Sequence, residues 1–158
     1  MVELPFCAAI TSMVMRIAVL ADTHNHCPPG LVEHWRDADE IWHLGDVCAP
    51  ETLVEIEHLG RPLRVVRGNC DDHPAWPSVL DLELTGRRFQ LTHIPPPFAS
   101  AGVQFLLHGH THVPRDEVIA GVRWLNPGSL TRPRGGPASY AWLELVPGRP
   151  VRWKQVRV

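Results

Sequence analysis

The sequence has few cysteines, and no two of them form a C-x-x-C pair. The four cysteines are far apart in the chain, at Cys7, Cys27, Cys48 and Cys70. This spacing does not suit a zinc knuckle and gives no basis for a disulfide framework. We therefore expect the protein to work in a reducing, cytoplasmic setting.

The sequence also lacks a long apolar run, a basic N-terminal leader and an excess of positive charge. No segment is long enough to span a membrane, and Glu3 near the start argues against a signal peptide. The formal net charge is −2, so no basic field indicates nucleic-acid binding. We therefore expect no membrane partner and no nucleic-acid partner.

The composition is that of one globular domain. Of the 158 residues, 44% are hydrophobic and 20% are charged, which is enough for a single core. The first predicted strand begins at Met15, and Met13 or Met15 is a possible start of translation. We expect residues 1–12 to be a disordered extension and residues 13–158 to form the domain.

Strands and helices alternate in the first half of the chain. Apolar runs predict strands over residues 15–21, 40–44 and 63–66, and the intervening segments predict helices over 31–35 and 51–59. This alternation indicates parallel pairing with right-handed crossovers. The second half predicts a hairpin, 79–84 and 88–92 around Thr85-Gly86-Arg87, then strands over 103–107, 117–120, 122–125, 140–146 and 151–158. These elements together predict two facing sheets with a few helices outside them.

Polar clusters stand at the carboxyl ends of five predicted strands. In open α/β sheets, ligands bind at this end of the strands. The clusters offer two carboxylates, one amide and four imidazoles, a mixed set that suits Mn²⁺, Fe²⁺, Zn²⁺, Ni²⁺ or Co²⁺. Seven groups are enough to bind two metal ions that share one carboxylate. Two such ions, roughly 3.5–4 Å apart, can activate a water molecule and bind a phosphate between them. The candidates are Asp22, His24, Asp46, Asn69, His93, His110 and His112.

Spacing and glycine support this assignment. His110 and His112 are two residues apart, as are Asp22 and His24, so in an extended chain each pair faces one side. Glycine precedes Asp46, Asn69 and His110, and a residue without Cβ allows a sharp turn or a close approach to the metal.

These motifs resemble the calcineurin-like metallophosphoesterase superfamily, specifically its small bacterial and archaeal phosphodiesterase branch. The matching segments are ADTH (21–24), LGD (44–46), RGNCD (67–71), TH (92–93), GHTH (109–112), NPGS (126–129) and RPR (132–134). The resemblance covers residues 15–158. It implies an α/β fold, a four-layer α/β/β/α sandwich in which two facing mixed sheets are flanked by helices.

The resemblance also implies roles for the seven candidates. Asp22, His24 and His112 would hold the first metal, Asn69, His93 and His110 the second, and Asp46 would bridge both. The implied cofactors are two divalent ions, Mn²⁺ foremost, with Fe, Zn, Ni and Co as alternatives. The implied activity is hydrolysis of phosphodiesters or phosphomonoesters by a metal-bridging hydroxide.

The predicted catalytic residues are Asp46, Asn69, Cys70 and Asp71. Cys70 stands where larger relatives carry a histidine that assists the leaving group. A thiol has a pKa near ~8.5, so we expect good leaving groups to be favoured; Cys70 as a simple buried thiol is the alternative. Asp71 is expected to orient a ligand or a loop.

The link from His93 to His110 departs from the family pattern. Ile94 and Pro95-Pro96-Pro97 replace a glycine and a helix, so the link is shortened and cannot be helical there. The surroundings of the second metal and the substrate rim are the parts most affected.

Several other polar residues have two readings. His43 and His108 are expected to pack in the core or to support metal ligands. His26 and His73 lie in loops after the metal clusters, and their side chains either contact substrate or have no role in the site. Residues 126–129 form a turn, which the resemblance places beneath the metal site. Arg132 and Arg134 either bind substrate phosphate or are plain loop residues.

Two other functions compete with the hydrolase. One branch of the superfamily, a retromer scaffold subunit, keeps the fold as an interaction surface but has lost metal histidines, whereas all seven positions here hold competent ligands. A nuclease would need many more clustered cations. We therefore expect a small phosphorylated substrate, and the resemblance implies a homo-dimer or tetramer.

Overall fold

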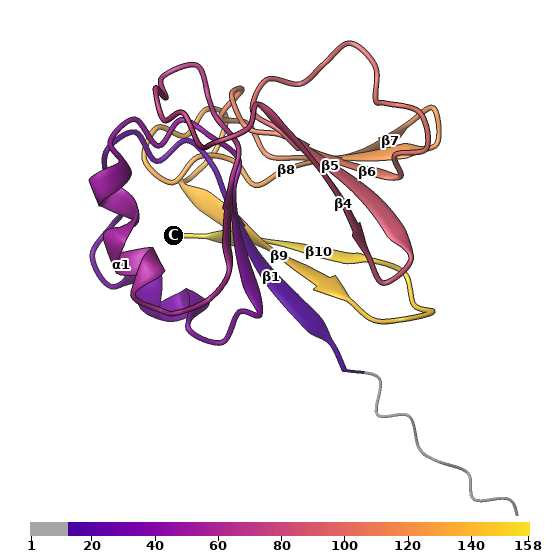
Figure 1. Ribbon diagram of the computed structural model, residues 1–158, viewed down its shortest axis with the longest axis horizontal. Coiled ribbons are helices and arrows are strands. Elements are labelled where there is room, and N and C mark those ends of the chain that lie inside the picture. The colour runs from indigo at the N-terminus through magenta and orange to yellow at the C-terminus, as the bar shows by residue number, and fades with distance from the viewer. Residues whose placement is uncertain (1–12) are drawn as a thin grey trace, which may run out of the picture.

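The computed structural model describes residues 13–158, and the predicted disordered extension, residues 1–12, lies outside the described residues. Two five-stranded sheets make up most of the domain (Figure 1). The strand order is β10-β9-β1-β2-β3 in the first sheet and β4-β5-β6-β8-β7 in the second.

The first sheet contains the predicted parallel strands. β1 pairs in parallel with β2, and β2 pairs in parallel with β3, whereas β9 is antiparallel to both β1 and β10. The bounds are Met15–Leu20 for β1, Glu40–His43 for β2, Leu63–Val65 for β3, Ser139–Leu145 for β9 and Arg152–Arg157 for β10. All five strands were predicted within a few residues.

The second sheet is also mixed. β4 and β5 form the predicted hairpin, β5 and β8 each pair in parallel with β6, and β7 is antiparallel to β8. The bounds are Val79–Leu84 for β4, Arg87–Thr92 for β5, Phe105–Leu107 for β6, Arg115–Ile119 for β7 and Val122–Asn126 for β8.

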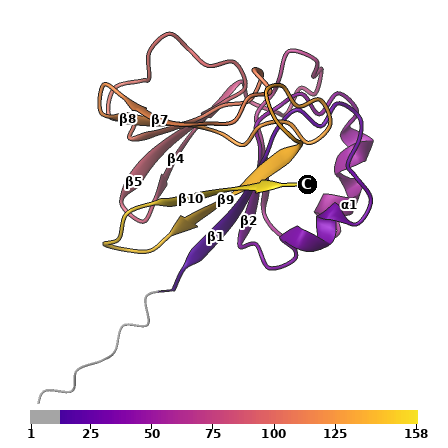
Figure 2. The ribbon, with the colours of Figure 1, turned by 180° about the vertical axis from the view of Figure 1, so that it is seen from behind.

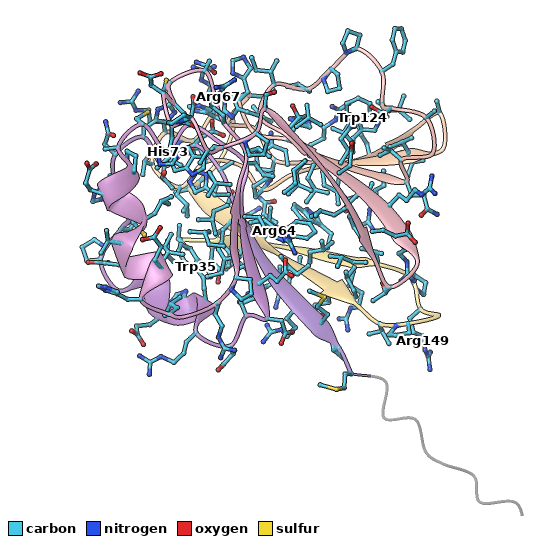
Figure 3. All side chains as sticks on the ribbon, viewed as in Figure 1. Trp35, Arg64, Arg67, His73, Trp124 and Arg149 are labelled. Carbon is cyan, nitrogen blue, oxygen red and sulfur yellow. The ribbon has the colours of Figure 1, made fainter. Side chains whose placement is uncertain are left out.

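Three short helical segments cover the outer face of the first sheet. They are the 3-10 helices η1 (Leu31–Trp35) and η2 (Pro50–Leu53) and the α-helix α1 (Val54–Glu57), and they lie on one side of the molecule in both ribbon views (Figures 1 and 2). Fully buried Trp35 lies between these segments and the sheet (Figure 3). The helices predicted over 31–35 and 51–59 are therefore present, the second as η2 followed by α1.

Side-chain alternation along β1 explains how the layers assemble. Ala18 and Leu20 face the helical segments, whereas Ile17 and Val19 belong to the core between the two sheets. Each face of the strand thus buries apolar surface, as a strand covered on both sides requires. The predicted α/β fold with two facing mixed sheets is confirmed.

The outer face of the second sheet has no helix over it within residues 13–158. The link between β5 and β6 is an irregular loop, because Pro95-Pro96-Pro97 cannot supply the N–H groups of a helix. Ser100 in this loop accepts a 2.7 Å hydrogen bond from Gln90 on β5. The helices of the expected four-layer arrangement thus flank only the first sheet.

The parallel strands of both sheets direct their carboxyl ends to one rim. β1, β2 and β3 end there in the first sheet, and β5, β6 and β8 end there in the second. Their connecting loops gather above the sheets in Figure 1. Within the described range, no helix is long and apolar enough to cross a membrane.

Candidate metal centre

The loops at this rim bring the seven predicted ligands together. They surround a cavity of about 450 Å³ lined by His24, Asp46, Asn69, His110 and His112, with Cys70 and residues 132–134 at its edge. Asp22 and His93 are buried next to it. The predicted ligands come from loops that follow β1, β2, β3, β5 and β6.

One half of the cluster consists of Asp22, His24, Asp46 and His112. His112 Nε2 lies 3.3 Å from His24 Nε2 and 3.3 Å from Asp22 Oδ1. His24 Nε2 lies 3.7 Å from Asp46 Oδ2. Ligand atoms from all four residues lie within 4.8 Å of one another, close enough to hold one metal ion.

The other half consists of Asp46, Asn69, His93 and His110. Asn69 Oδ1 lies 2.9 Å from His93 Nε2 and 3.0 Å from His110 Nδ1. Asp46 Oδ1 lies 3.3 Å from His93 Nε2. Asp46 therefore turns one carboxylate oxygen to each half of the cluster, which is the position that a bridging ligand requires.

Hydrogen bonds on the far side of two imidazoles set their tautomers. His93 Nδ1 donates to the Leu44 carbonyl at 2.8 Å, and His112 Nδ1 donates to the Arg132 carbonyl at 2.6 Å. A carbonyl oxygen only accepts, so in the neutral rings the proton sits on Nδ1 and Nε2 turns a lone pair into the cluster. This is the tautomer that binds a metal.

Several hydrogen-bond acceptors point into the cluster without a donor to meet them. Asp22 is fully buried, and its Oδ2 has no hydrogen-bond partner. The Nε2 lone pair of His93 faces the Asn69 amide oxygen, so two acceptors oppose each other. Buried acceptors without donors are costly, and a divalent ion in each half would satisfy them. The donor set therefore fits two metal ions.

Burial and neighbouring charge shape the acid–base state of the cluster. Burial, with the nearby Asp46 charge, raises the pKa of Asp22 to about 8. Burial alone would also raise the pKa of Asp46, but the Cys70 N–H and the neighbouring His93 outweigh it and lower that pKa. Burial lowers the pKa of His24 and of His93, so both imidazoles are neutral near neutral pH.

The raised pKa of Asp22 predicts that metal affinity depends on pH. Asp22 must lose a proton before it binds a cation, so affinity is complete above its pKa of about 8 and declines below it. We expect the apparent affinity of the metal-free protein for Mn²⁺ to fall roughly tenfold per pH unit below that point. Calorimetric titration at several pH values measures this slope. Asp22→Asn is the matched control, since it removes the titrating group; a flat wild-type profile would contradict the assignment.

Two glycines permit the close approach of the loops. A Cβ on Gly68 would lie 2.2 Å from the Asp46 nitrogen and 2.3 Å from Asp46 Oδ1. A Cβ on Gly45, whose φ is +90°, would lie 2.8 Å from His93 Nδ1. Glycine at these two positions thus allows the loops to approach each other closely, whereas the predicted close approach to a metal stays a prediction.

The backbone of the ligand loops differs from the extended chain assumed from spacing. Left-handed backbone occurs at Asp22 (φ 55°), His24 (φ 44°), Asp46 (φ 58°), His110 (φ 66°) and His112 (φ 60°). The expectation that residues two apart face one side is wrong for His110 and His112, which belong to different halves. Asp22 and His24 do lie in the same half, but through left-handed backbone and not through an extended chain. Left-handed non-glycine residues cost about 1–3 kcal/mol each and cluster at functional sites.

Asp71 and the turn after β8 hold the loops in place. The Asp71 carboxylate accepts hydrogen bonds from the N–H groups of Asp46, Cys48 and Gly68, at 2.9, 2.7 and 2.7 Å. Ser129 Oγ donates to the Asp22 carbonyl at 2.9 Å, and Asn126 Nδ2 donates to the Gly109 carbonyl at 3.0 Å. Asp71 thus contacts the loops, in keeping with an orienting role, and residues 126–129 lie beneath the cluster.

The other histidines take supporting or remote positions. His43 is fully buried, 3.0 Å from Thr23 Oγ1, and accepts from the Gly45 N–H at 3.2 Å. His108 packs at 3.2 Å from an Arg115 nitrogen on the outer face of the second sheet. His26 is exposed and His73 stacks on Trp76, and neither lines the ligand cavity.

The sequence left the roles of two residues at the cavity open and gave no role to a third residue near it. Arg132 and Arg134 line its edge and are exposed. Cys48 lies in the metal-centre region with its Sγ 3.5 Å from His24 Nδ1. The spacing of the cysteines contains no signal for Cys48, since its neighbours come from other loops.

The sequence matches one known family and several of its members. Residues 15–147 match the model described as the calcineurin-like phosphoesterase superfamily domain. A probable metallophosphoesterase of Methanothermobacter thermautotrophicus is 33% identical over 138 residues, which is 76% of this chain and 80% of that protein. The phosphodiesterase YfcE of Escherichia coli is 32% identical over 146 residues, or 81% of this chain and 71% of YfcE.

Solved structures agree with the fold. The E. coli YfcE structure, described as that of a phosphoesterase, superimposes with a TM-score of 0.73 at 26% identity, covering 91% of this chain and 100% of YfcE. Vacuolar Protein Sorting 29 of Cryptosporidium parvum superimposes with a TM-score of 0.72 at 17% identity, covering 92% of this chain and 99% of that one. At that identity the second likeness concerns the fold alone.

Proposed function

Because the chain belongs to the calcineurin-like phosphoesterase superfamily, we propose that it hydrolyses phosphodiester or phosphomonoester bonds at a binuclear metal centre. The observation that carries the proposal is the placement of Asp46. Its two carboxylate oxygens face two separate groups of ligands, 3.3 Å from His93 and 3.7 Å from His24. Two ions that share this carboxylate are the arrangement used for phosphoryl hydrolysis.

We propose Asp22, His24 and His112 as ligands of the first ion, Asn69, His93 and His110 as ligands of the second, and Asp46 as the bridge. When bound, two Mn²⁺ ions, or Fe, Zn, Ni or Co in their place, would supply a nucleophile at neutral pH and neutralise phosphate charge. The residues of the chain fix the ligand geometry, because carbonyl partners hold His93 and His112 in the tautomer with Nε2 free.

The cavity edge favours a small anionic substrate. Arg132 and Arg134 are exposed beside the cluster and can pair with phosphate oxygens outside the metal ligands. Partial desolvation and the nearby Asp46 charge raise the pKa of the Cys70 thiol. The thiol therefore stays protonated at neutral pH and is a weak acid toward a leaving group. We therefore expect phenolate-type leaving groups to be cleaved faster than alkoxides. Assembly as a dimer or tetramer remains part of the proposal.

Removal of metal tests the proposed function directly. We expect the protein to hydrolyse bis-p-nitrophenyl phosphate with Mn²⁺, to lose this activity after chelation and dialysis, and to regain it when Mn²⁺ returns. The physical reason is that the proposed nucleophile is a water activated by the cations, so it is lost when they leave. Release of p-nitrophenolate is the measurement. Undiminished turnover by protein shown to be metal-free would exclude the mechanism and leave the interaction-scaffold alternative.

A further inference from the structure

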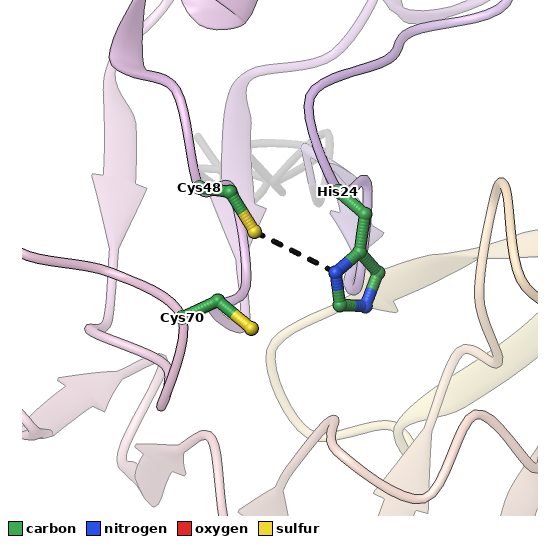
Figure 4. A group of neighbouring side chains, drawn as sticks. All are labelled: His24, Cys48 and Cys70. Carbon is green, nitrogen blue, oxygen red and sulfur yellow. Dashed lines mark hydrogen bonds between the residues drawn. The ribbon is translucent and has the colours of Figure 1, made fainter.

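A second group of ligand atoms lies beside the metal centre, and none of these atoms binds an ion in the proposed hydrolytic centre. One ring nitrogen of His24, Cys48 Sγ and Cys70 Sγ all lie within 4.8 Å of one another, and Nδ1 is the nitrogen nearest Cys48, at 3.5 Å. Figure 4 shows both thiols directed toward the same side of the His24 ring. We propose that these three atoms form an additional site for a thiophilic cation such as Zn²⁺ or Cd²⁺, which shares His24 with the phosphoesterase centre.

The distances suit a tetrahedral ion. With zinc–sulfur bonds near 2.3 Å and zinc–nitrogen bonds near 2.0–2.1 Å, neighbouring sulfur and nitrogen ligands lie about 3.5 Å apart. The distance from His24 Nδ1 to Cys48 Sγ is 3.5 Å. Thiolate and imidazole together select soft or borderline cations over Mn²⁺ and Mg²⁺.

His24 differs from His93 and His112 in the partner of its Nδ1 atom. His93 and His112 turn Nδ1 to backbone carbonyls, which only accept hydrogen bonds. His24 turns Nε2 toward Asp46 and His112, and turns Nδ1 toward the Cys48 sulfur, which is itself a metal ligand. Its imidazole can therefore serve the first hydrolytic ion through Nε2 or the thiophilic ion through Nδ1.

Two carboxylates hold the cysteine loops together. The Cys48 N–H donates to Asp71 Oδ1 at 2.7 Å, and the Cys70 N–H donates to Asp46 Oδ1 at 2.9 Å. Cys48 adopts left-handed backbone (φ 68°), and Cys70 is exposed at the cavity edge. The site is thus preformed by loop contacts and open to ions from solvent, next to negative charge that favours a cation.

Proton release accompanies binding. A thiol has an ordinary pKa of about 8.5, so both cysteines carry a proton at neutral pH when no cation is bound. The cation replaces both thiol protons and takes the one free lone pair of the neutral His24 ring, which the first hydrolytic ion also needs. The two sites therefore compete for His24, and thiophilic ions should weaken binding of the first Mn²⁺.

Spectroscopy of bound Co²⁺ tests the site without any substrate. The full chain is used in a Cys7→Ser background, freed of metal and titrated with Co²⁺, whose thiolate complexes show a sulfur-to-metal charge-transfer band. We expect this band in the parent protein, a weaker band in Cys48→Ser and Cys70→Ser, and none in the double variant. Cys27→Ser is the matched control, because Cys27 packs against the core under the helical segments and should leave the band unchanged.

Three results would overturn the proposal: a band that persists in the double variant, a band lost in Cys27→Ser, or Co²⁺ saturation of the parent without a band. Cys70→Ala, at an exposed position, gives a second test that is independent of core packing. The readout does not require hydrolysis, so failure of this site and failure of the phosphoesterase proposal are distinguishable by assaying Mn²⁺-dependent turnover on the parent sample.

Discussion

Replacing Asp46 by alanine is expected to remove nearly all hydrolytic activity and to lower the metal content of the protein. Asp46 is the residue whose two oxygens face both halves of the ligand cluster, at 3.3 Å from His93 and 3.7 Å from His24. In the proposed centre, its loss would take one ligand from each ion and remove the negative charge between the two cations. We expect kcat/KM to fall at least roughly a hundredfold, or about 2.7 kcal/mol of transition-state stabilisation.

Asp46 also accepts a hydrogen bond from the loop that follows β3. The test therefore needs a variant that removes the negative charge of Asp46 but keeps this hydrogen bond. Asp46 Oδ1 accepts the Cys70 N–H at 2.9 Å, and Asp46→Asn keeps an oxygen that can make this bond while losing the charge. Asp72→Asn is the matched control, because Asp72 is exposed two residues beyond Cys70 and does not line the cavity. Turnover of bis-p-nitrophenyl phosphate and bound manganese per chain are the measurements. A wild-type rate with two bound ions in Asp46→Ala would refute the bridging role.

Gly68→Ala is expected to disrupt the centre without changing any ligand. The new Cβ would lie 2.2 Å from the Asp46 nitrogen, and a backbone atom held in a packed loop cannot move aside as a flexible side chain can. The loops after β2 and β3 must therefore separate, which draws Asp46 away from Asn69. We expect a loss of roughly 1–3 kcal/mol in unfolding free energy, about 2–4 °C in Tm per kcal/mol, and at least roughly tenfold lower activity.

The chain offers a matched glycine for comparison. A Cβ on Gly136 would meet no atom within 4 Å, and Gly136 lies in the exposed loop just after Arg134. Gly136→Ala should therefore keep the Tm, the metal content and the turnover of the parent. Thermal unfolding with and without Mn²⁺ and the phosphodiester assay are measured on both variants. Normal metal binding by Gly68→Ala would show that the loops approach less closely than the structure places them.

Short-range patterns were sufficient to predict most of the secondary structure. Continuous apolar runs located β1, β2 and β3, because a strand with two buried faces must be apolar along its length. The turn at Thr85-Gly86 located the hairpin of β4 and β5. The short helices were harder to bound, since η2 and α1 together span only residues 50–57 and helix ends depend on tertiary contacts.

The sequence by itself determined the inventory of the centre: carboxylate, amide and imidazole groups that follow apolar strands, with glycines between them. Only the tertiary structure decided how this inventory divides. Left-handed turns send His110 and His112 to different halves, and Asp46 reaches both. It also placed Cys48 beside Cys70 and His24. Local pattern reports which way a residue faces along its own element, whereas distances between loops far apart in the chain arise from the packing of the two sheets.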